Sequence, residues 1–306
     1  MPMPTTASLP VFLEHRRRLT RLAYRYLGSV ADAEDVVQEA WLRFEGAPPA
    51  REPARLLSTI VTRLCLDRLK SARHRREVYV GEWLPEPVVG EPTAGEGDTA
   101  LDISFAVMRA LERLSPAERA AFFLHDLWDL PFEEVGEVLA RSPEACRKLA
   151  SRARRNLTEA RQRFKPSALD VERLADALKV SVETGDPGVL KAMLAADAEL
   201  VTDGGGKVLA ARNVIHGADA VARFLVGVAS KSTVLGDVSV THADINDAPG
   251  MLVLIGGVLD QTFAFDLDEA GLVRAIYVVR NPDKLRAVGG RGRAVIAATG
   301  PGRDGQ

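Results

Sequence analysis

The chain has 306 residues, 46% of them hydrophobic, and a formal net charge of −2. This length is too great for one small domain, and the composition is ordinary for globular protein. No apolar run reaches the length of a membrane span, and arginines interrupt residues 11–27, which argues against a signal peptide. Cys65 and Cys146 fall on predicted apolar helix faces, so neither a disulfide framework nor a metal site is indicated. We expect a cytoplasmic protein of two or three domains without metal or other cofactor.

The first part of the chain is predicted to be helical. A helix over residues 9–27 precedes a second helix that Asp32 caps. A long helix begins near Ala54, and residues 51–76 hold eight lysines and arginines against two acidic residues. Cations near a helix C-terminus interact favourably with the helix dipole, so this basic patch alone is a weak sign of DNA binding.

Residues 77–100 are predicted to be a linker because they are rich in proline, glycine and acidic residues and lack lysine and arginine. Trp83 and Leu84 stand out in this segment. A tryptophan that stays exposed loses a large burial free energy, so we expect Trp83 to dock on another part of the protein. The alternative is an incidental aromatic residue in a flexible segment.

The second part of the helical region ends in a helix-turn-helix pattern. A helix is predicted over residues 101–114, and a capping box at Ser115 starts another that runs to about Trp128. Two further helices follow, and Ser142 with Pro143 starts the second of them. Residues 141–165 carry nine basic and two acidic residues. A surface kept soluble by mixed charges would alternate signs, so the excess indicates a helix that enters the DNA major groove.

After Pro166 the pattern changes to an α+β domain with one curved sheet. Helices are expected over residues 168–184, from Asp186 to about Ala195, and over 218–229. Residues 289–306 are expected to be disordered. The predicted strands are 199–202, 207–212, 233–241, 251–255, 258–267 and 273–280.

The helical region resembles regions 2 and 4 of extracytoplasmic-function (ECF) sigma factors. Three segments carry the resemblance: ADAEDVVQEAWLRF (31–44), ARLLSTIVTRLCLDRLKSARHRR (54–76) and ACRKLASRARRNL (145–157). Three further motifs resemble the subgroup with a C-terminal SnoaL-like, NTF2-like extension: WLPEP (83–87), DGGGK (203–207) and NPDKL (281–285).

The resemblance implies a multi-domain protein. Two all-α sigma domains, a region 2 helical bundle and a region 4 helix-turn-helix, would precede an α+β SnoaL/NTF2-like, cone-shaped domain. The expected divisions are region 2 at 1–80, the linker at 81–105, region 4 at 106–165, the SnoaL-like domain at 166–286 and the tail at 287–306. The function implied is that of a promoter-specificity subunit of bacterial RNA polymerase, with no catalytic activity of its own.

The resemblance also assigns partners and site residues. The partners would be promoter DNA and core RNA polymerase, through its β′ clamp and β flap. The clamp contact would use Asp35, Gln38, Glu39, Trp41 and Arg43. The −10 element would be read and held by Thr62, Arg63, Asp67, Arg68, Lys70, Arg73, Arg75 and Arg76. The −35 element would be contacted by Glu144, Arg147, Lys148, Ser151, Arg152, Arg154 and Arg155.

The C-terminal extension allows two interpretations. Relatives of this fold include enzymes with a carboxylate base, for which the candidates are Asp203, His216, Asp260 and Asp266, but the sequence shows neither a tuning pocket nor a polarising partner. The other interpretation is a regulatory latch on the linker, because three consecutive glycines indicate a tight turn or a close backbone approach. Its residues would be Trp83, Leu84, Pro85, Glu86, Pro87, Asp203, Gly204, Gly205, Gly206, Lys207, Asn281, Pro282, Asp283, Lys284 and Leu285.

Two whole-protein functions follow from this sequence. The first is a sigma factor whose extension sets the arrangement of its two DNA-binding domains. The second is a one-component regulator that joins a helix-turn-helix to a ligand-binding or enzymatic SnoaL-like domain. The first 76 residues favour the sigma factor, because a one-component regulator has no use for a clamp-docking helix and a second basic helix. For a ligand in the SnoaL-like pocket, a small apolar molecule is the natural expectation.

Overall fold

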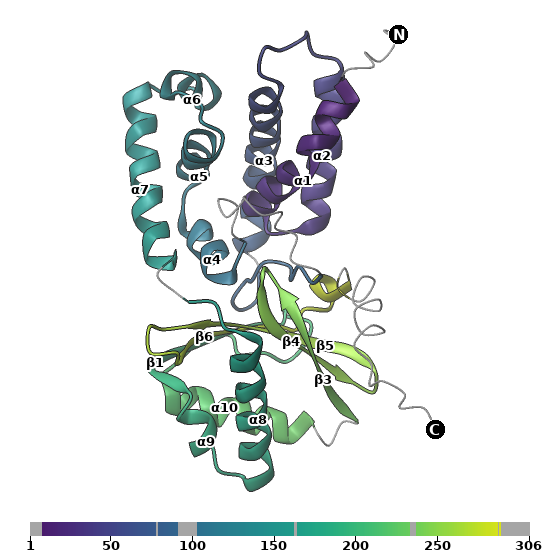
Figure 1. Ribbon diagram of the computed structural model, residues 1–306, viewed down its shortest axis with the longest axis vertical. Coiled ribbons are helices and arrows are strands. Elements are labelled where there is room, and N and C mark those ends of the chain that lie inside the picture. Colours follow the sequence, from purple (N-terminus) through teal and green to yellow (C-terminus); the bar gives the residue numbers. More distant parts are fainter. Residues whose placement is uncertain are drawn as a thin grey trace. The chain divides into compact units, whose positions relative to one another are not determined.

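A computed structural model describes residues 8–77, 79–90, 103–161, 164–232, 237–286 and 288, without the side chains of 71–77, 159–161 and 232. The chain divides into two compact units (Figure 1). The first, here called the helical unit, comprises Met1–Val78 and Glu96–Gln162. The second, here called the C-terminal module, comprises Tyr79–Gly95 and Arg163–Gln306. The linker motif therefore belongs to the same unit as the α+β domain.

Three helices form the first bundle of the helical unit: α1 (Ser8–Leu27), α2 (Val30–Glu45) and α3 (Pro53–Glu77). Their apolar stripes bury Leu19, Val36 and Val61 almost completely. The prediction that Asp32 caps α2 was wrong. Ser29 has extended backbone angles and its hydroxyl accepts the Asp32 N–H at 3.3 Å, which places Asp32 in the first turn.

The second bundle contains α4 (Phe105–Arg113), α5 (Pro116–Phe122), the π-helical turn η2 (Phe123–Leu127), α6 (Phe132–Leu139) and α7 (Pro143–Arg161). The capping box at Ser115 is confirmed. The single helix expected to reach Trp128 instead changes from α to π geometry at Phe123. Between α6 and α7, Ala140 takes the left-handed conformation with φ 51°, which makes the turn of the helix-turn-helix short.

The two bundles pack on each other within the helical unit. The buried Arg119 guanidinium donates to the carbonyl oxygens of Tyr26 and Leu111. Arg18 donates to the Leu127 carbonyl at 2.6 Å, so α1 and the π turn are joined by a charge-assisted hydrogen bond. The ring of Tyr26 also meets Phe123 edge-on, with 4.8 Å between centroids.

The C-terminal module is a six-stranded sheet with helices on one face (Figure 1). The strands lie in the order β2-β1-β6-β5-β4-β3; β1 and β6 are parallel and the other pairs are antiparallel. A core that includes Leu174, Val221 and Phe265 fills the space between sheet and helices. The elements are α8 (Ala168–Thr184), α9 (Gly188–Lys191), β1 (Leu194–Asp203), β2 (Ile215–His216), α10 (Ala218–Ser232), β3 (Val238–Ile245), β4 (Ala248–Ile255), β5 (Val258–Leu267) and β6 (Val273–Val279).

Two predicted elements of the module differ from the structure. The strand expected over 207–212 is a loop, because Lys207 and Val208 donate back to the Gly204 carbonyl and fold the chain on itself. The helix expected to reach Ala195 ends at Lys191, and the chain enters β1 at Leu194. Residues 233–236 of a predicted strand, and the tail predicted to be disordered, lie outside the described residues.

Candidate nucleic-acid interface and linker-binding site

Helix α7 presents the side chains that the sequence assigned to the −35 element. Cys146, Ala150 and Leu157 bury one stripe of the helix against the bundle, so the remaining faces turn toward solvent. The seven assigned residues are Glu144, Arg147, Lys148, Ser151, Arg152, Arg154 and Arg155, and all are exposed.

Some of these cations already have partners. Arg154 makes a bidentate contact with Asp126, with 2.7 Å from Nη2 to Oδ1 and 3.1 Å from Nε to Oδ2. Lys148 pairs with Glu144 one turn earlier at 2.7 Å, and the Arg147 guanidinium lies 5.2 Å from the centre of the Phe132 ring. No sequence pattern indicated Asp126, because it lies 28 residues before Arg154 and only the folded turn brings them together.

The −10 candidates on α3 are divided between core and surface. Thr62 is fully buried and its Oγ1 accepts the Tyr26 hydroxyl at 3.3 Å. Arg63 and Asp67 are exposed, whereas Arg68 pairs with Asp32 at 3.2 Å on the neighbouring helix. Lys70 is exposed as well and pairs with Asp67 at 2.8 Å; the side chains of Arg73, Arg75 and Arg76 lie outside the described residues.

The candidate clamp-binding face of α2 mixes exposed side chains with side chains that pack inside the bundle. Asp35 and Gln38 are exposed, and Glu39 pairs with Arg43 at 2.7 Å. Trp41 instead packs toward Phe12, with 4.9 Å between ring centroids, so its side chain is partly buried in the bundle. Leu42 is 63% exposed one turn after Gln38 and was not among the residues assigned from the sequence. Its spacing from the assigned residues was the available signal.

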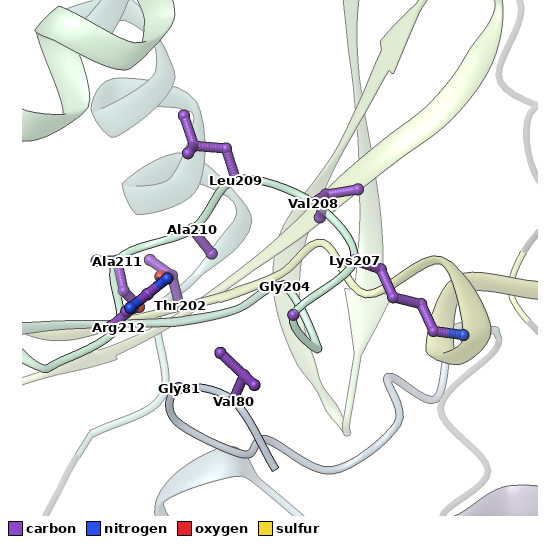
Figure 2. A pocket seen from close by; sticks show the side chains of 11 residues that line it. Val80, Gly81, Thr202, Gly204, Lys207, Val208, Leu209, Ala210, Ala211 and Arg212 are labelled. Carbon is purple, nitrogen blue, oxygen red and sulfur yellow. The ribbon is translucent and has the colours of Figure 1, made fainter.

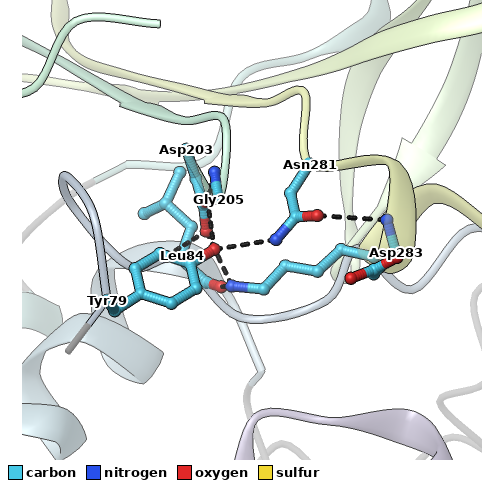
Figure 3. A network of polar contacts seen from close by, with 7 residues as sticks. Tyr79, Leu84, Asp203, Gly205, Asn281 and Asp283 are labelled. Atoms are coloured by element: carbon cyan, nitrogen blue, oxygen red, sulfur yellow. Dashed lines mark hydrogen bonds and ion pairs between the residues drawn. The ribbon is translucent and has the colours of Figure 1, made fainter. Parts of the chain in front are cut away.

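In the C-terminal module, Asp203 at the end of β1 binds the linker (Figure 3). Its carboxylate is fully buried and accepts the Tyr79 hydroxyl at 2.6 Å, the Leu84 N–H at 2.8 Å and the Gly205 N–H at 3.0 Å. Burial, and then the hydrogen bond to Asp203, raise the pKa of Tyr79 above its ordinary value. Asn281 donates to the same Tyr79 oxygen at 2.8 Å. The DGGGK, WLPEP and NPDKL segments therefore meet at one carboxylate.

Lys284 neutralises this buried carboxylate. Its ammonium donates to Asp203 at 2.6 Å and to the Leu84 carbonyl. The same ammonium lies 4.3 Å from the centre of the Trp83 ring and 5.1 Å from that of Tyr79. A buried cation between two aromatic rings and a carboxylate has every side occupied, as an ion pair removed from water requires. We call Tyr79, Trp83, Leu84, Asp203, Asn281 and Lys284 the linker latch.

The three glycines have a steric reason. A Cβ on Gly205 would lie 2.3 Å from Asn281 Nδ2, and one on Gly204 would lie 2.5 Å from the Val208 carbonyl oxygen. Gly206 also lies close to the linker, since a Cβ added to it would be 3.0 Å from the Cβ of Val80. The loop therefore folds tightly and lets the linker and the NPDKL segment approach its backbone.

A cavity of about 270 Å³ lies beside the latch (Figure 2). Val80 and Gly81 of the linker form one side, and the loop from Gly204 to Arg212 forms the other. Figure 2 shows Thr202 and Arg212 at one end, whereas Lys207 extends away. Because linker and loop both contribute, the cavity exists in this form only with the linker docked.

The four enzyme candidates are engaged in separate contacts. Asp203 belongs to the latch, and Asp260 makes a bidentate ion pair with Arg280, with 3.1 Å from Nη2 to Oδ1 and 3.2 Å from Nε to Oδ2. Asp266 accepts the Tyr277 hydroxyl at 2.6 Å, and the exposed His216 lies 3.7 Å from Glu199. Within the described residues, no helix is suited to span a membrane and no group of side chains is arranged to hold a metal ion.

Comparison with known proteins identifies the family. Residues 11–75 match the model of sigma-70 region 2, and residues 104–157 match that of sigma-70 region 4. The chain is 36% identical over 292 residues to the ECF RNA polymerase sigma factor SigJ of Mycobacterium tuberculosis, covering 88% of this chain and 90% of SigJ. It belongs to the ECF sigma factors.

Two further comparisons support this assignment. The chain is 31% identical over 294 residues to the probable ECF sigma factor SigI of M. tuberculosis, covering 91% of this chain and 96% of that protein. The crystal structure of M. tuberculosis SigJ matches with a TM-score of 0.69 and 34% identity, covering 90% of this chain and 98% of SigJ. The protein is thus an ECF sigma factor that directs RNA polymerase to promoters, with two helical sigma domains followed by a SnoaL-like α/β domain. A one-component regulator is not favoured.

Proposed function

We propose that the C-terminal module regulates this sigma factor by holding the linker between its two DNA-binding domains. The observation that supports this most directly is the buried Asp203–Lys284 pair, which closes around the backbone of Leu84. Removing two charges from water is costly unless both are paired and hydrogen-bonded. Such a pair favours one docked position of the linker over many loose ones, which is what a two-state switch needs.

Promoter recognition is proposed to follow the family pattern at the residues predicted from the sequence. Glu144, Arg147, Lys148 and Ser151 would face base edges of the −35 element, and Arg152, Arg154 and Arg155 would hold phosphates. On α3, Arg63 and Asp67 would contact the −10 element, and their exposure supports this. Thr62 can do so only after it separates from Tyr26, because it is buried in this structure.

Core polymerase is proposed to bind at the β′ clamp through α2 and at the β flap through the second bundle. Asp35, Gln38, Glu39 and Arg43 would supply polar contacts, and the exposed Leu42 would supply apolar area among them. We also propose the domain divisions given by the sequence, with residues 79 and 80 moved from region 2 to the linker, a cytoplasmic location, and a C-terminal module without catalytic activity. The separate engagement of Asp203, Asp260 and Asp266 supports the last point.

A small ligand is proposed to act at the cavity beside the latch rather than inside the sheet. The region between sheet and helices is filled by apolar side chains, whereas the cavity has Val80 on one side and Ala210 on the other. An apolar molecule bound there would contact linker and loop together and would stabilise the docked linker. A Val80→Asp variant should then lose saturable binding of an apolar fluorescent probe while keeping the fold.

Transcription from purified components tests the regulatory function. Full-length protein and a chain ending at Lys165 are each combined with core polymerase and a promoter that the full-length protein recognises. The truncated chain should give a changed yield of run-off transcript, because the linker has lost its binding site. Equal yields from both chains at every promoter tested would reject the regulatory role. Failure of the full-length protein to bind core polymerase would reject the polymerase contacts as well.

A further inference from the structure

The C-terminal module binds the chain again beyond the WLPEP motif. The turn between β3 and β4 places Asn246 in the left-handed conformation at φ 53°, with 1% of its surface exposed. Its Oδ1 accepts the Val88 N–H at 2.9 Å, and its own N–H donates to the Val88 carbonyl at 2.9 Å. Val89 then pairs with Ile245 as an antiparallel bridge. These hydrogen bonds are made by the backbone of the linker.

The segment that follows the DNA-reading helix α7 is bound to the same sheet. Phe164 and Leu267 exchange two backbone hydrogen bonds, at 3.0 and 2.8 Å. Lys165 approaches the carbonyl of Asp247 in the β3–β4 turn at 3.4 Å. The next helix, α8, starts at once, capped by Ser167. The module therefore binds both chain segments that flank the second bundle.

Only short connections join α3 and α7 to the chain segments that the module binds. Helix α3 ends at Glu77, two residues before Tyr79 of the latch, and α7 ends at Arg161, three residues before Phe164. An extended chain spans at most 3.3–3.6 Å per residue, so these connections reach only about 7 and about 10 Å. Once both the latch and the contact at Val88 and Val89 are released, residues 78–104 allow a separation of α3 and α4 of up to about 90 Å.

We infer that the C-terminal module is a short strut that connects the C-terminal ends of the two DNA-reading helices, α3 and α7. With both segments bound, α3 and α7 can separate only as far as the module and the two short connections allow. A partner that binds only when α3 and α7 lie further apart requires one of the two bound chain segments to leave the module. Part of the partner's binding free energy is then needed to open the latch, so partner binding and linker release are coupled. This inference rests on the proposed function of the module as a regulator.

Lengthening one connection tests the strut without touching any of its contacts. Ten glycine and serine residues are inserted between Gln162 and Arg163 of the full-length chain, which adds a flexible reach of about 18 Å. The dissociation constant for core RNA polymerase is then measured. We expect binding to become at least threefold tighter, because α3 and α7 can separate while the latch stays closed. A five-residue insertion should give an intermediate change.

A matched control and a combined variant make the result decisive. The same ten residues between Gly256 and Gly257, at an exposed hairpin tip, should leave the dissociation constant unchanged. Asp203→Asn should also tighten binding to core polymerase, and Tyr79→Phe replaces it if that variant does not fold. Adding the 162–163 insertion to either variant should tighten binding no further, because both changes act on one strut. The strut is overturned if the insertion fails to tighten binding, if the control insertion matches it, or if the two effects add. If the latch variants also leave binding unchanged, the proposed regulatory function fails too.

Discussion

Helix α7 and the linker latch both depend on charged side chains, but they hold them in opposite environments. The arginines of α7 stand exposed, with Arg154 on Asp126 as a surface ion pair. In the latch, Lys284 and Asp203 are 9% and 0% exposed and are enclosed by Trp83 and Tyr79. Exposed cations stay available to a polyanion and are screened by salt, whereas a buried pair is fixed in one geometry. Charged side chains are therefore suited to DNA binding in one region and to positioning in the other.

The latch contains its own internal comparison. The loops that contribute Asp203 and Lys284 also contribute Lys207 and Asp283, which form an ion pair with side chains 52% and 44% exposed. Lys207, through its hydrogen bond, lowers the pKa of Asp283. Because that pair is in contact with solvent, its contribution to stability is small. The two pairs share their loops and differ in burial, so substituting each one separates the effect of burial from that of charge.

The largest effect is expected from Asp203→Asn. It leaves the Lys284 ammonium buried without its counter-charge, which should lower the unfolding free energy of the module by about 3–5 kcal/mol. Asp283→Asn, the matched control on the exposed pair, should change it by less than about 1 kcal/mol. Urea denaturation gives both values, and hydrogen exchange of residues 79–90 reports release of the linker. Equal losses for the two variants would contradict the distinction between buried and exposed pairs.

A smaller loss is expected from Gly205→Ala, which tests whether the latch needs a close backbone approach. Gly205 has φ 62° and its new Cβ would lie 2.3 Å from Asn281 Nδ2. Gly256 has a similar φ of 57° with nothing within 4 Å, so Gly256→Ala measures the conformational cost alone. Gly205→Ala should cost about 1–3 kcal/mol more than Gly256→Ala in thermal or urea unfolding. Similar costs would show that the crowding at Asn281 relaxes freely.

On α7, two exposed arginines should behave differently in DNA binding. Arg147→Ala should weaken binding to the preferred promoter by about 1–3 kcal/mol and relax sequence preference, because the side chain is proposed to read a base. Arg155→Ala should weaken binding to all sequences alike and lower the salt slope by about one, as loss of a phosphate contact requires. Fluorescence anisotropy over a range of salt concentrations measures both. If the two variants give the same slope and the same sequence preference, the roles assigned along α7 are wrong.

The smallest effect concerns pH. Burial raises the pKa of Tyr79, so above about pH 10 an unfolded chain loses this proton before the folded chain does. The latch contribution is therefore fully present below pH 10 and declines as pH rises further. Tyr79→Phe should cost about 0.5–1.5 kcal/mol at pH 8 through the lost hydrogen bonds. In urea unfolding from pH 8 to 11, the difference in unfolding free energy between Tyr79→Phe and the wild type should shrink. A constant difference would contradict the hydrogen-bonding role given to the Tyr79 hydroxyl.

Local patterns predicted most of the helices and the family. The capping box at Ser115, the N-terminal Ser142-Pro143 pair and the bounds of α8 follow from residue types a few positions apart. The motifs at 83–87, 203–207 and 281–285 also marked three segments for one role without showing how they touch. Patterns failed where a short segment depends on distant neighbours. The loop at 207–212 has strand-like residues but folds back on Gly204, and β1 pairs in parallel with β6 from the far end of the domain.

The amino-acid order alone thus determined which residues are apolar, which helices carry one-signed charge, and which family the protein belongs to. Only the tertiary structure decided which charges are buried. It paired Lys284 with Asp203 rather than with a nearby carboxylate, buried Thr62 beneath Tyr26, and placed Asn246 against the backbone of Val88. Those contacts join residues from 36 to 158 positions apart. Their free energies depend on exclusion of water, which no local pattern encodes.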